Sequence, residues 1–263
     1  MTSSNPIVAG SSTALREVGK LFALGLDVVR NLFKRPFQLR ELIEQLWFIA
    51  SVSILPSALI SLAFGAVISL QLGSLLRQIG APSVAGATSV LANVQQAAPI
   101  ICALLIAGAG GTAICADLGA RTIREEISAL EVLGISPVQR LVVPRVLASA
   151  VVAVLLNGLI SIVGVAGGYF YNVVLQHGTP GAYLAGFSQL AQPADLVIGA
   201  IKAVFFGVTA GLVAAYRGLN PPSGPKGVGD AVNQSVVISF LLVFLINVAL
   251  TGIYLTLVPP KGM

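Results

Sequence analysis

The chain has 263 residues, of which 56% are hydrophobic and only 10% are Asp, Glu, Lys or Arg, and its formal net charge at pH 7 is +5. A soluble domain carries about 25% charged residues, because its surface must face water. This composition excludes a soluble enzyme and predicts an all-α integral membrane protein that crosses the bilayer several times.

Residues 1–46 differ from the rest of the chain because apolar and charged residues alternate at helical spacing until Pro36. The pattern predicts an amphipathic helix that lies in the inner membrane surface. A second short helix, from Gln38 to Leu46, is expected to lead into the membrane at Trp47, a residue typical of the interface. The region does not resemble a signal peptide, since no compact apolar core precedes a cleavage site. The apolar stripe of the first helix consists of Leu15, Val18, Phe22, Leu26, Val29 and Phe33.

The membrane spans are marked by four stretches without Asp, Glu, Lys or Arg. Each of these stretches exceeds the roughly 20 apolar residues that a helix needs to cross the bilayer core. We therefore expect five spans within a membrane domain formed by residues 47–263. The charge-free stretches are residues 45–76, 78–116, 146–194 and 231–260. The expected spans lie near residues 47–76, 84–116, 141–175, 196–216 and 231–258.

A few residues inside the spans have structural consequences. Pro56 and Pro99 fall in the first two spans, where a proline usually bends a helix. Lys202 is expected to extend to the headgroups as an interfacial anchor, with a role in coupling as the alternative. Two glycine pairs at a spacing of four predict close packing of neighbouring helices: Gly164 with Gly168, and Gly207 with Gly211.

The segment Gly108-Ala109-Gly110-Gly111-Thr112-Ala113 superficially matches a dinucleotide-binding fingerprint. That motif must follow a strand, whereas this segment continues an apolar helix, so we interpret its small residues as a helix-packing surface. The sequence also contains no Gly-x-x-x-x-Gly-Lys-Ser/Thr phosphate loop. If ATP drives this protein, a partner must hold the nucleotide.

The cysteines and the histidine carry no recognisable chemistry. Cys102 and Cys115 lie 13 residues apart in one apolar stretch, too far along a helix to form a disulfide, so we interpret them as packing residues. His177 stands alone in a turn-rich outer loop near residues 176–195. We expect neither a metal site nor a proton relay there.

The positions of the 15 Lys and Arg residues indicate the orientation. Six lie in residues 1–46, four in residues 117–145 and two after Tyr216, whereas Arg77 and Lys261 fall on the opposite side. With Lys202 set aside, this ratio of 12 to 2 predicts a cytoplasmic amino terminus and an extracytoplasmic carboxyl terminus.

Residues 117–145 form an island of charge between two long apolar stretches. Thr122, with Glu125 or Glu126, is expected to begin a helix there, and Gly134 followed by Pro137 to end it. The pattern predicts a short cytoplasmic helix whose charged face either docks a partner protein or is simply solvated. The apolar stripe of this helix consists of Ile123, Ile127, Leu130 and Leu133.

Four motifs in and around this island resemble those of one family, the MlaE/YrbE permeases, which are the membrane subunits of Mce-type lipid ABC transporters. The motifs are Ala107-Gly108-Ala109-Gly110-Gly111-Thr112-Ala113, Asp117-Leu118-Gly119, Arg124-Glu125-Glu126-Ile127-Ser128-Ala129-Leu130-Glu131-Val132-Leu133-Gly134-Ile135 and Val142-Val143-Pro144-Arg145. The resemblance extends from about residue 12 to the end of the chain and is strongest to the actinobacterial (mycobacterial) YrbE branch.

This resemblance implies an inner-membrane permease that works as a dimer, here expected to be a heterodimer with a related chain. It also implies a cytoplasmic ATPase dimer that binds ATP and Mg, and Mce lipid-binding proteins outside the membrane. No cofactor in this chain and no nucleic-acid partner are implied. The island helix resembles the coupling helix that sits in a groove of the ATPase, and its contact residues would be Arg124, Glu125, Glu126, Ala129, Leu130 and Gly134.

The resemblance further implies a lipid cavity between the two permeases. Proteobacterial members have an Arg-Glu pair where this chain has Gln95 and Gln96, Arg where it has Ala109, and Asp where it has Asn247. The loss of these charges favours a more apolar cargo. The cavity candidates are Phe64, Leu70, Gln71, Gly73, Leu75, Gln96 and Ala97.

The implied function is not enzymatic: the chain would move lipid between Mce proteins and the inner membrane, by import of a fatty acid, sterol or similar apolar lipid. A non-transporting scaffold that anchors Mce proteins is one alternative. An ion-coupled carrier is another, although Lys202 is the only ionisable residue expected inside the spans. The identity of the lipid, the direction of transport and the choice between identical and related chains in the dimer stay open.

Overall fold

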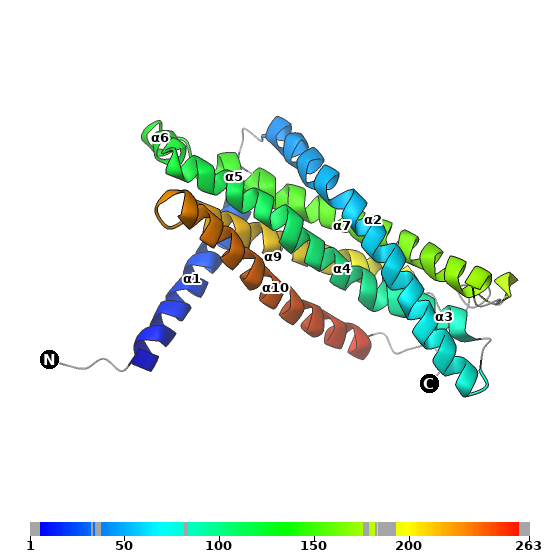
Figure 1. Cartoon of the computed structure of the whole chain (residues 1–263). Coiled ribbons are helices and arrows are strands. Elements are labelled where there is room, and N and C mark those ends of the chain that lie inside the picture. Colours follow the sequence, from blue (N-terminus) through cyan, green and yellow to red (C-terminus); the bar gives the residue numbers. More distant parts are fainter. Residues whose placement is uncertain are drawn as a thin grey trace.

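A computed structural model describes residues 6–32, 34, 38–81, 84–175, 179–181, 183 and 193–257. These residues form helices and turns, and no strand occurs among them. The long helices lie along one another as an elongated bundle, and α1 (Pro6–Leu32) extends away from one end of it (Figure 1). The all-α fold expected from the sequence is confirmed.

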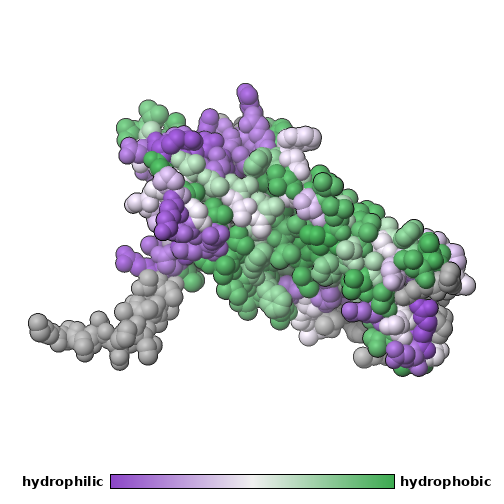
Figure 2. Space-filling view, viewed as in Figure 1, coloured by the Kyte–Doolittle hydropathy of each residue, from purple (hydrophilic) through white to green (hydrophobic). Residues whose placement is uncertain are grey.

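Within the described residues, five helical segments are long and apolar enough to cross a membrane, as predicted. Most extend beyond the expected ends, because charge-free stretches mark the apolar core whereas a helix also continues through charged residues. Figure 2 shows hydrophobic residues across the middle of the bundle and hydrophilic residues towards its two ends, the pattern of a membrane protein. The five segments are Leu39–Gln78, Ala85–Ile123, Val138–Leu175, Ala194–Leu219 and Gly224–Tyr254.

The first span is a single helix, α2 (Leu39–Gln78), of 40 residues. The separate short helix expected over Gln38–Leu46 is wrong, because these residues are good helix formers and no glycine or proline separates them from the span. Pro56 lies inside α2 without ending it. Trp47 is 77% exposed, which agrees with the expected position at the membrane interface.

The α-helix of the second span is interrupted twice by a π-helical turn. It consists of α3 (Ala85–Ala92), α4 (Ala98–Leu105) and α5 (Gly111–Ile123), joined by the π-helical turns η2 (Asn93–Ala97) and η3 (Ile106–Gly110). Pro99 lies in the first turn of α4, directly after η2. Since proline has no N–H for the helical ladder, the wider turn before it accommodates the missing bond.

The other three spans complete the bundle. The third consists of η4 (Val138–Val142), α7 (Val143–Phe170) and η5 (Tyr171–Leu175), and the fourth and fifth are α9 (Pro193–Leu219) and α10 (Gly224–Leu257). His177, which the sequence placed in an outer loop, lies outside the described residues.

Helices α2 and α7 pack closely through small residues. The Oγ of Ser69 donates a hydrogen bond of 3.1 Å to the carbonyl oxygen of Gly168, which a larger side chain at either position would prevent. A Cβ atom on Gly65 would lie 2.0 Å from the carbonyl oxygen of Gly164. The buried face of α2 repeats a small residue every fourth position: Ser53, Ser57, Ser61, Gly65, Ser69 and Gly73.

The predicted glycine packing is confirmed at most positions. A Cβ atom on Gly207 would lie 2.5 Å from the Cα of Ala150, so α7 and α9 also meet closely. Gly110 lies against Ile49 of α2. At Gly108 an added Cβ would meet no neighbouring atom of the described residues within 4 Å, so a packing role there stays a prediction.

Helix α1 contacts the bundle through one polar cluster and a few apolar residues. The hydroxyl of Tyr216 on α9 donates a hydrogen bond of 2.8 Å to Glu17, and Val28 is buried. The predicted apolar stripe faces outward: Val18 and Phe22 are 67% and 70% exposed. An outward apolar stripe agrees with an interfacial helix, whose position in the membrane surface stays a prediction.

Candidate functional site

The charged island has a different local structure from the one predicted. Helix α5 continues to Ile123, and α6 (Glu126–Val132) begins only after a break at Glu125, whose φ of 60° lies in the left-handed region. The expectation that Thr122 begins the helix is wrong. Its hydroxyl instead donates to the carbonyl oxygen of Leu118, one turn earlier, at 2.9 Å, so Thr122 belongs to the last turn of α5.

Helix α6 divides its apolar residues between two sides. Ile127 and Leu130 pack against the main hydrophobic core, as their stripe predicted. Leu133, expected on the same stripe, is 71% exposed, and the neighbouring Val132 is 88% exposed. We call Val132, Leu133 and Ile135 the apolar tip, because these three exposed residues lie at the end of α6 or just beyond it. Gly134, with φ of 72°, allows the chain to turn between them.

The six residues expected to contact an ATPase do not all face outward. Arg124, Glu125, Ala129 and Gly134 are exposed and available to a partner. Glu126 is engaged within the chain, at 2.8 Å from Nε of Arg124 and 3.7 Å from Nη1 of Arg121. Since Leu130 turns towards the core, four of the six candidates form an outward surface next to the apolar tip.

The lipid-cavity candidates lie mainly on exposed helix faces. Phe64, Leu70, Gln71 and Leu75 of α2 are exposed, as is Gln96 of η2. The remaining two, Gly73 and Ala97, are buried. Their contact with lipid stays a prediction.

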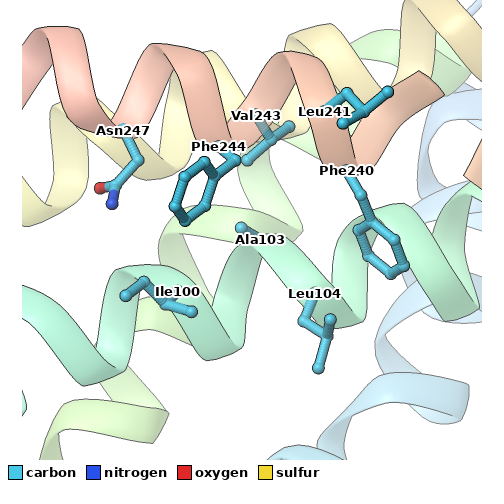
Figure 3. A pocket seen from close by; sticks show the side chains of 8 residues that line it. All are labelled: Ile100, Ala103, Leu104, Phe240, Leu241, Val243, Phe244 and Asn247. Atoms are coloured by element: carbon cyan, nitrogen blue, oxygen red, sulfur yellow. The ribbon is translucent and has the colours of Figure 1, made fainter. Parts of the chain in front are cut away.

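An apolar groove of about 280 Å³ lies between α4 and α10 (Figure 3). We call it the α4–α10 groove. One polar side chain reaches it: Asn247 is only 7% exposed, and its Oδ1 accepts no hydrogen bond from the described residues. Gln96, Ile100 and Leu104 are exposed at a spacing of four, so the predicted cavity residue Gln96 lies just before the groove along the same span. The groove is lined by Ile100, Ala103, Leu104, Phe240, Leu241, Val243, Phe244 and Asn247.

Lys202 does not extend to the headgroups as expected. It is 2% exposed, and its Nζ donates a hydrogen bond of 2.8 Å to Oγ1 of Thr251 on α10. The prediction failed because the Lys202 face of α9 packs against α10, which hydropathy along one helix does not reveal.

These geometries can be compared with known proteins. Residues 42–253 match the family model described as Permease MlaE. The chain belongs to the MlaE permease family. A probable ABC transporter permease protein of Rickettsia prowazekii is 30% identical over 239 residues, which cover 91% of this chain and 92% of the relative. A probable ABC transporter permease protein of Synechocystis is 31% identical over 233 residues, 88% of each chain.

A third relative has a more specific name. The intermembrane phospholipid transport system permease protein MlaE of Haemophilus influenzae is 28% identical over 213 residues, which cover 81% of this chain and 82% of the relative. The chain described here is therefore related to ABC transporter permeases over most of its length. The matches come from several bacterial groups and a plant, and they do not single out an actinobacterial branch.

Two charged clusters of this MlaE permease were not foreseen from its sequence. Asp195 is 3% exposed and accepts hydrogen bonds from Tyr254 and, at 2.8 Å, from Nε2 of Gln95. Arg145 is fully buried, with its guanidinium between Glu41 and Asp117. Asp195 could have been noticed because it directly follows a long charge-free stretch, where a lone charge needs a partner. No such signal marked Arg145, which lies at the end of the charged island.

Proposed function

We propose that this MlaE family member is the membrane subunit of an ATP-driven lipid transporter in the inner membrane, with its amino terminus in the cytoplasm. The observation that carries the proposal is α6, which presents an apolar tip between two spans of a chain related to ABC transporter permeases. A phosphate loop is absent from the sequence, so a separate ATPase dimer would bind ATP and Mg.

The contact with the ATPase would be mainly apolar at its centre. Val132 and Leu133 expose most of their surface, and exposed apolar residues of this size are typical of a docking site. Arg124, Glu125, Ala129 and Gly134 would form the polar and backbone rim around them. For ATP to drive movement, α6 must bind the ATPase differently in its two nucleotide states, because equal affinity for both states shifts no equilibrium.

The lipid would pass along the α4–α10 groove, at the junction with a second, related permease chain. Its lining is apolar apart from Asn247, whose buried Oδ1 accepts no hydrogen bond from the described residues and would need a movement of α10 to reach a lipid hydroxyl or carboxylic acid. The apolar lining favours a fatty acid, sterol or similar apolar lipid as the cargo. Import, with delivery by Mce proteins, is the direction that we propose. The exposed face of α2 that carries Phe64, Leu70, Gln71 and Leu75 would guide lipid towards the groove, with Gln96 at its entrance.

The experiment combines purification with a transport assay. The tagged chain, with Leu133→Asp or with the control Glu131→Gln on the same helix, is purified from its native membrane, and co-purifying proteins are identified by mass spectrometry. The complexes are placed in phosphatidylglycerol and phosphatidylethanolamine vesicles, and ATP-dependent movement of a fluorescent fatty acid is followed. We expect Leu133→Asp to lose the ATPase and the transport while Glu131→Gln keeps both.

Other outcomes would count against this proposal. A Leu133→Asp complex that keeps its ATPase and transports normally would refute the role of the apolar tip. Recovery of Mce proteins without any ATPase in the unaltered chain would favour a scaffold, and transport driven by an ion gradient without ATP would favour a carrier.

A further inference from the structure

Arg145 is the largest side chain in the described part of the chain that is completely buried. It lies in the first turn of α7, and its Nη2 is 2.5 Å from Oδ2 of Asp117 on α5 and 3.1 Å from Oε1 of Glu41 in the first turn of α2. Its Nη1 donates to the carbonyl oxygen of Leu141 at 2.8 Å. One guanidinium thus joins the middle of α5 to the first turns of α2 and α7.

The same cluster of charged side chains continues to helix α6. Oδ1 of Asp117 accepts a hydrogen bond of 3.2 Å from Nε of Arg121, and Nη1 of Arg121 lies 3.7 Å from Glu126 in the first turn of α6. Acidic and basic groups therefore alternate from Glu41 through Arg145, Asp117 and Arg121 to Glu126. Glu126 of α6 thus stands at one end of this path, and the buried Arg145 is its central link.

Burial makes the central link stiff. An arginine without solvent contact is costly to separate from its acidic partners, because an unpaired charge would remain in a poorly solvated site. The planar guanidinium also fixes the direction of both carboxylates better than an ammonium group would. The first turns of α2 and α7 are therefore held to α5 through this guanidinium.

We propose that Arg145 is a positioning residue that transmits the movement of the coupling helix α6 to the first span, α2, through Glu41. This inference rests on the proposed function, since it needs an ATPase that displaces α6. In this proposal Arg145 affects how many lipids are moved per ATP hydrolysed. It affects neither the binding of ATP nor the binding of lipid.

The test uses the complex with its co-purifying ATPase in the vesicles described above. ATP hydrolysis and the movement of a fluorescent fatty acid and a fluorescent phospholipid are measured together for four variants: Arg145→Gln, Arg145→Lys, Glu41→Gln and Glu44→Gln. Glu44 is the matched control, because it lies one turn after Glu41 and pairs at 3.0 Å with the side chain of Arg40, which is 94% exposed. An exposed pair of this kind contributes little.

We expect Glu41→Gln and Arg145→Gln to lower the lipid moved per ATP about tenfold, within the range typical of coupled sites, while ATPase co-purification and ATP hydrolysis persist. Arg145→Lys should be intermediate, since an ammonium group holds one carboxylate well but not two. Glu44→Gln should behave like the unaltered chain. If Arg145→Gln fails to assemble, Glu41→Gln decides, because its amide keeps the shape and a hydrogen-bonding oxygen.

Two results would overturn the inference. The lipid-to-ATP ratio of Glu41→Gln could equal that of the unaltered chain, or transport, hydrolysis and melting temperature could all fall in parallel, which is the signature of a purely structural role. If the unaltered complex moves neither probe with ATP, the proposed function fails and the inference fails with it.

Discussion

Replacing Gly65 with alanine tests whether the small residues of α2 set the distance between the first and third spans. The new Cβ would lie 2.0 Å from the carbonyl oxygen of Gly164, whereas ordinary contacts begin at 3.4 Å. The obstacle is backbone, so no side chain can rotate away. The two helices must therefore separate or tilt by about 1.4 Å at this crossing to restore ordinary contact.

The energetic cost follows from this displacement. A gap of about 0.5–1 Å already forfeits a quarter to a half of the dispersion energy between facing atoms, and overpacking typically costs about 1–3 kcal/mol. We expect a loss at the upper end, about 3 kcal/mol, because the clash involves two backbones. At roughly 2–4 °C per kcal/mol for a chain of this size, the melting temperature should fall by about 6–12 °C.

The chain contains a built-in reporter for this measurement. Cys102 and Cys115 are both completely buried, so a thiol-reactive fluorescent dye labels them only when the detergent-solubilised protein unfolds. Gly158→Ala is the control: Gly158 also lies in a span helix, α7, but a Cβ there would meet no neighbouring atom of the described residues within 4 Å. Alanine there should be neutral or stabilise by up to about 1 kcal/mol. The packing argument would be refuted if the melting temperature of Gly65→Ala equalled that of Gly158→Ala or exceeded that of the unaltered chain.

Three further changes test other features. Glu125→Gly should melt a few degrees above Glu125→Ala in the dye assay, because the left-handed φ of 60° costs a residue with a side chain about 1–2 kcal/mol and glycine almost nothing; equal midpoints would show that Glu125 is not strained. Lys202→Met should leave the melting temperature unchanged or raise it, because a buried charge whose one bonded partner among the described residues is the Thr251 hydroxyl gains little over an apolar side chain of similar length; a clear drop would contradict this. The hydrogen bond from Tyr216, followed by that from Lys20, lowers the pKa of Glu17 below its ordinary value of 4.5. The folded state thus binds fewer protons than the unfolded state, so the stabilisation is complete above pH 4.5 and is lost as the pH falls through the lower folded pKa. Tyr216→Phe should reduce this acid sensitivity in melting curves followed by circular dichroism, and an unchanged pH profile would exclude the Tyr216 bond as its source.

The spans could be predicted from the sequence because hydrophobicity along a helix is a local property. Each of the five expected spans corresponds to a helical segment, and the glycine pairs at Gly164 and Gly207 mark real helix contacts. The helix ends could not be predicted in the same way. Between Gln38 and Trp47, and again between Ala116 and Ile123, charged residues suggested a boundary where the backbone simply continues as helix.

The candidate site was only partly predictable, because side chains far apart in the sequence complete it. The end of α6 near Gly134 and its inward residues Ile127 and Leu130 followed from local spacing, whereas its start at Glu126 did not. The partners of Arg145 and of Lys202 did not, since Glu41 and Thr251 come from other helices. A sequence pattern predicts which residues share one face of a helix. It does not predict which residues of other helices pair with a buried charge.

The small size of α6 explains why its inner and outer sides must differ. Helices shorter than about 12 residues are marginal alone, so the 7 residues of α6 need support from the rest of the chain. Ile127 and Leu130 supply it through the core, and Glu126 through its ion pairs. The outer side, with Val132 and Leu133, is exposed and can bind a partner. The inner side packs against the helices that would have to move in the proposed transport cycle. A longer helix could be stable without these contacts, whereas α6 depends on them.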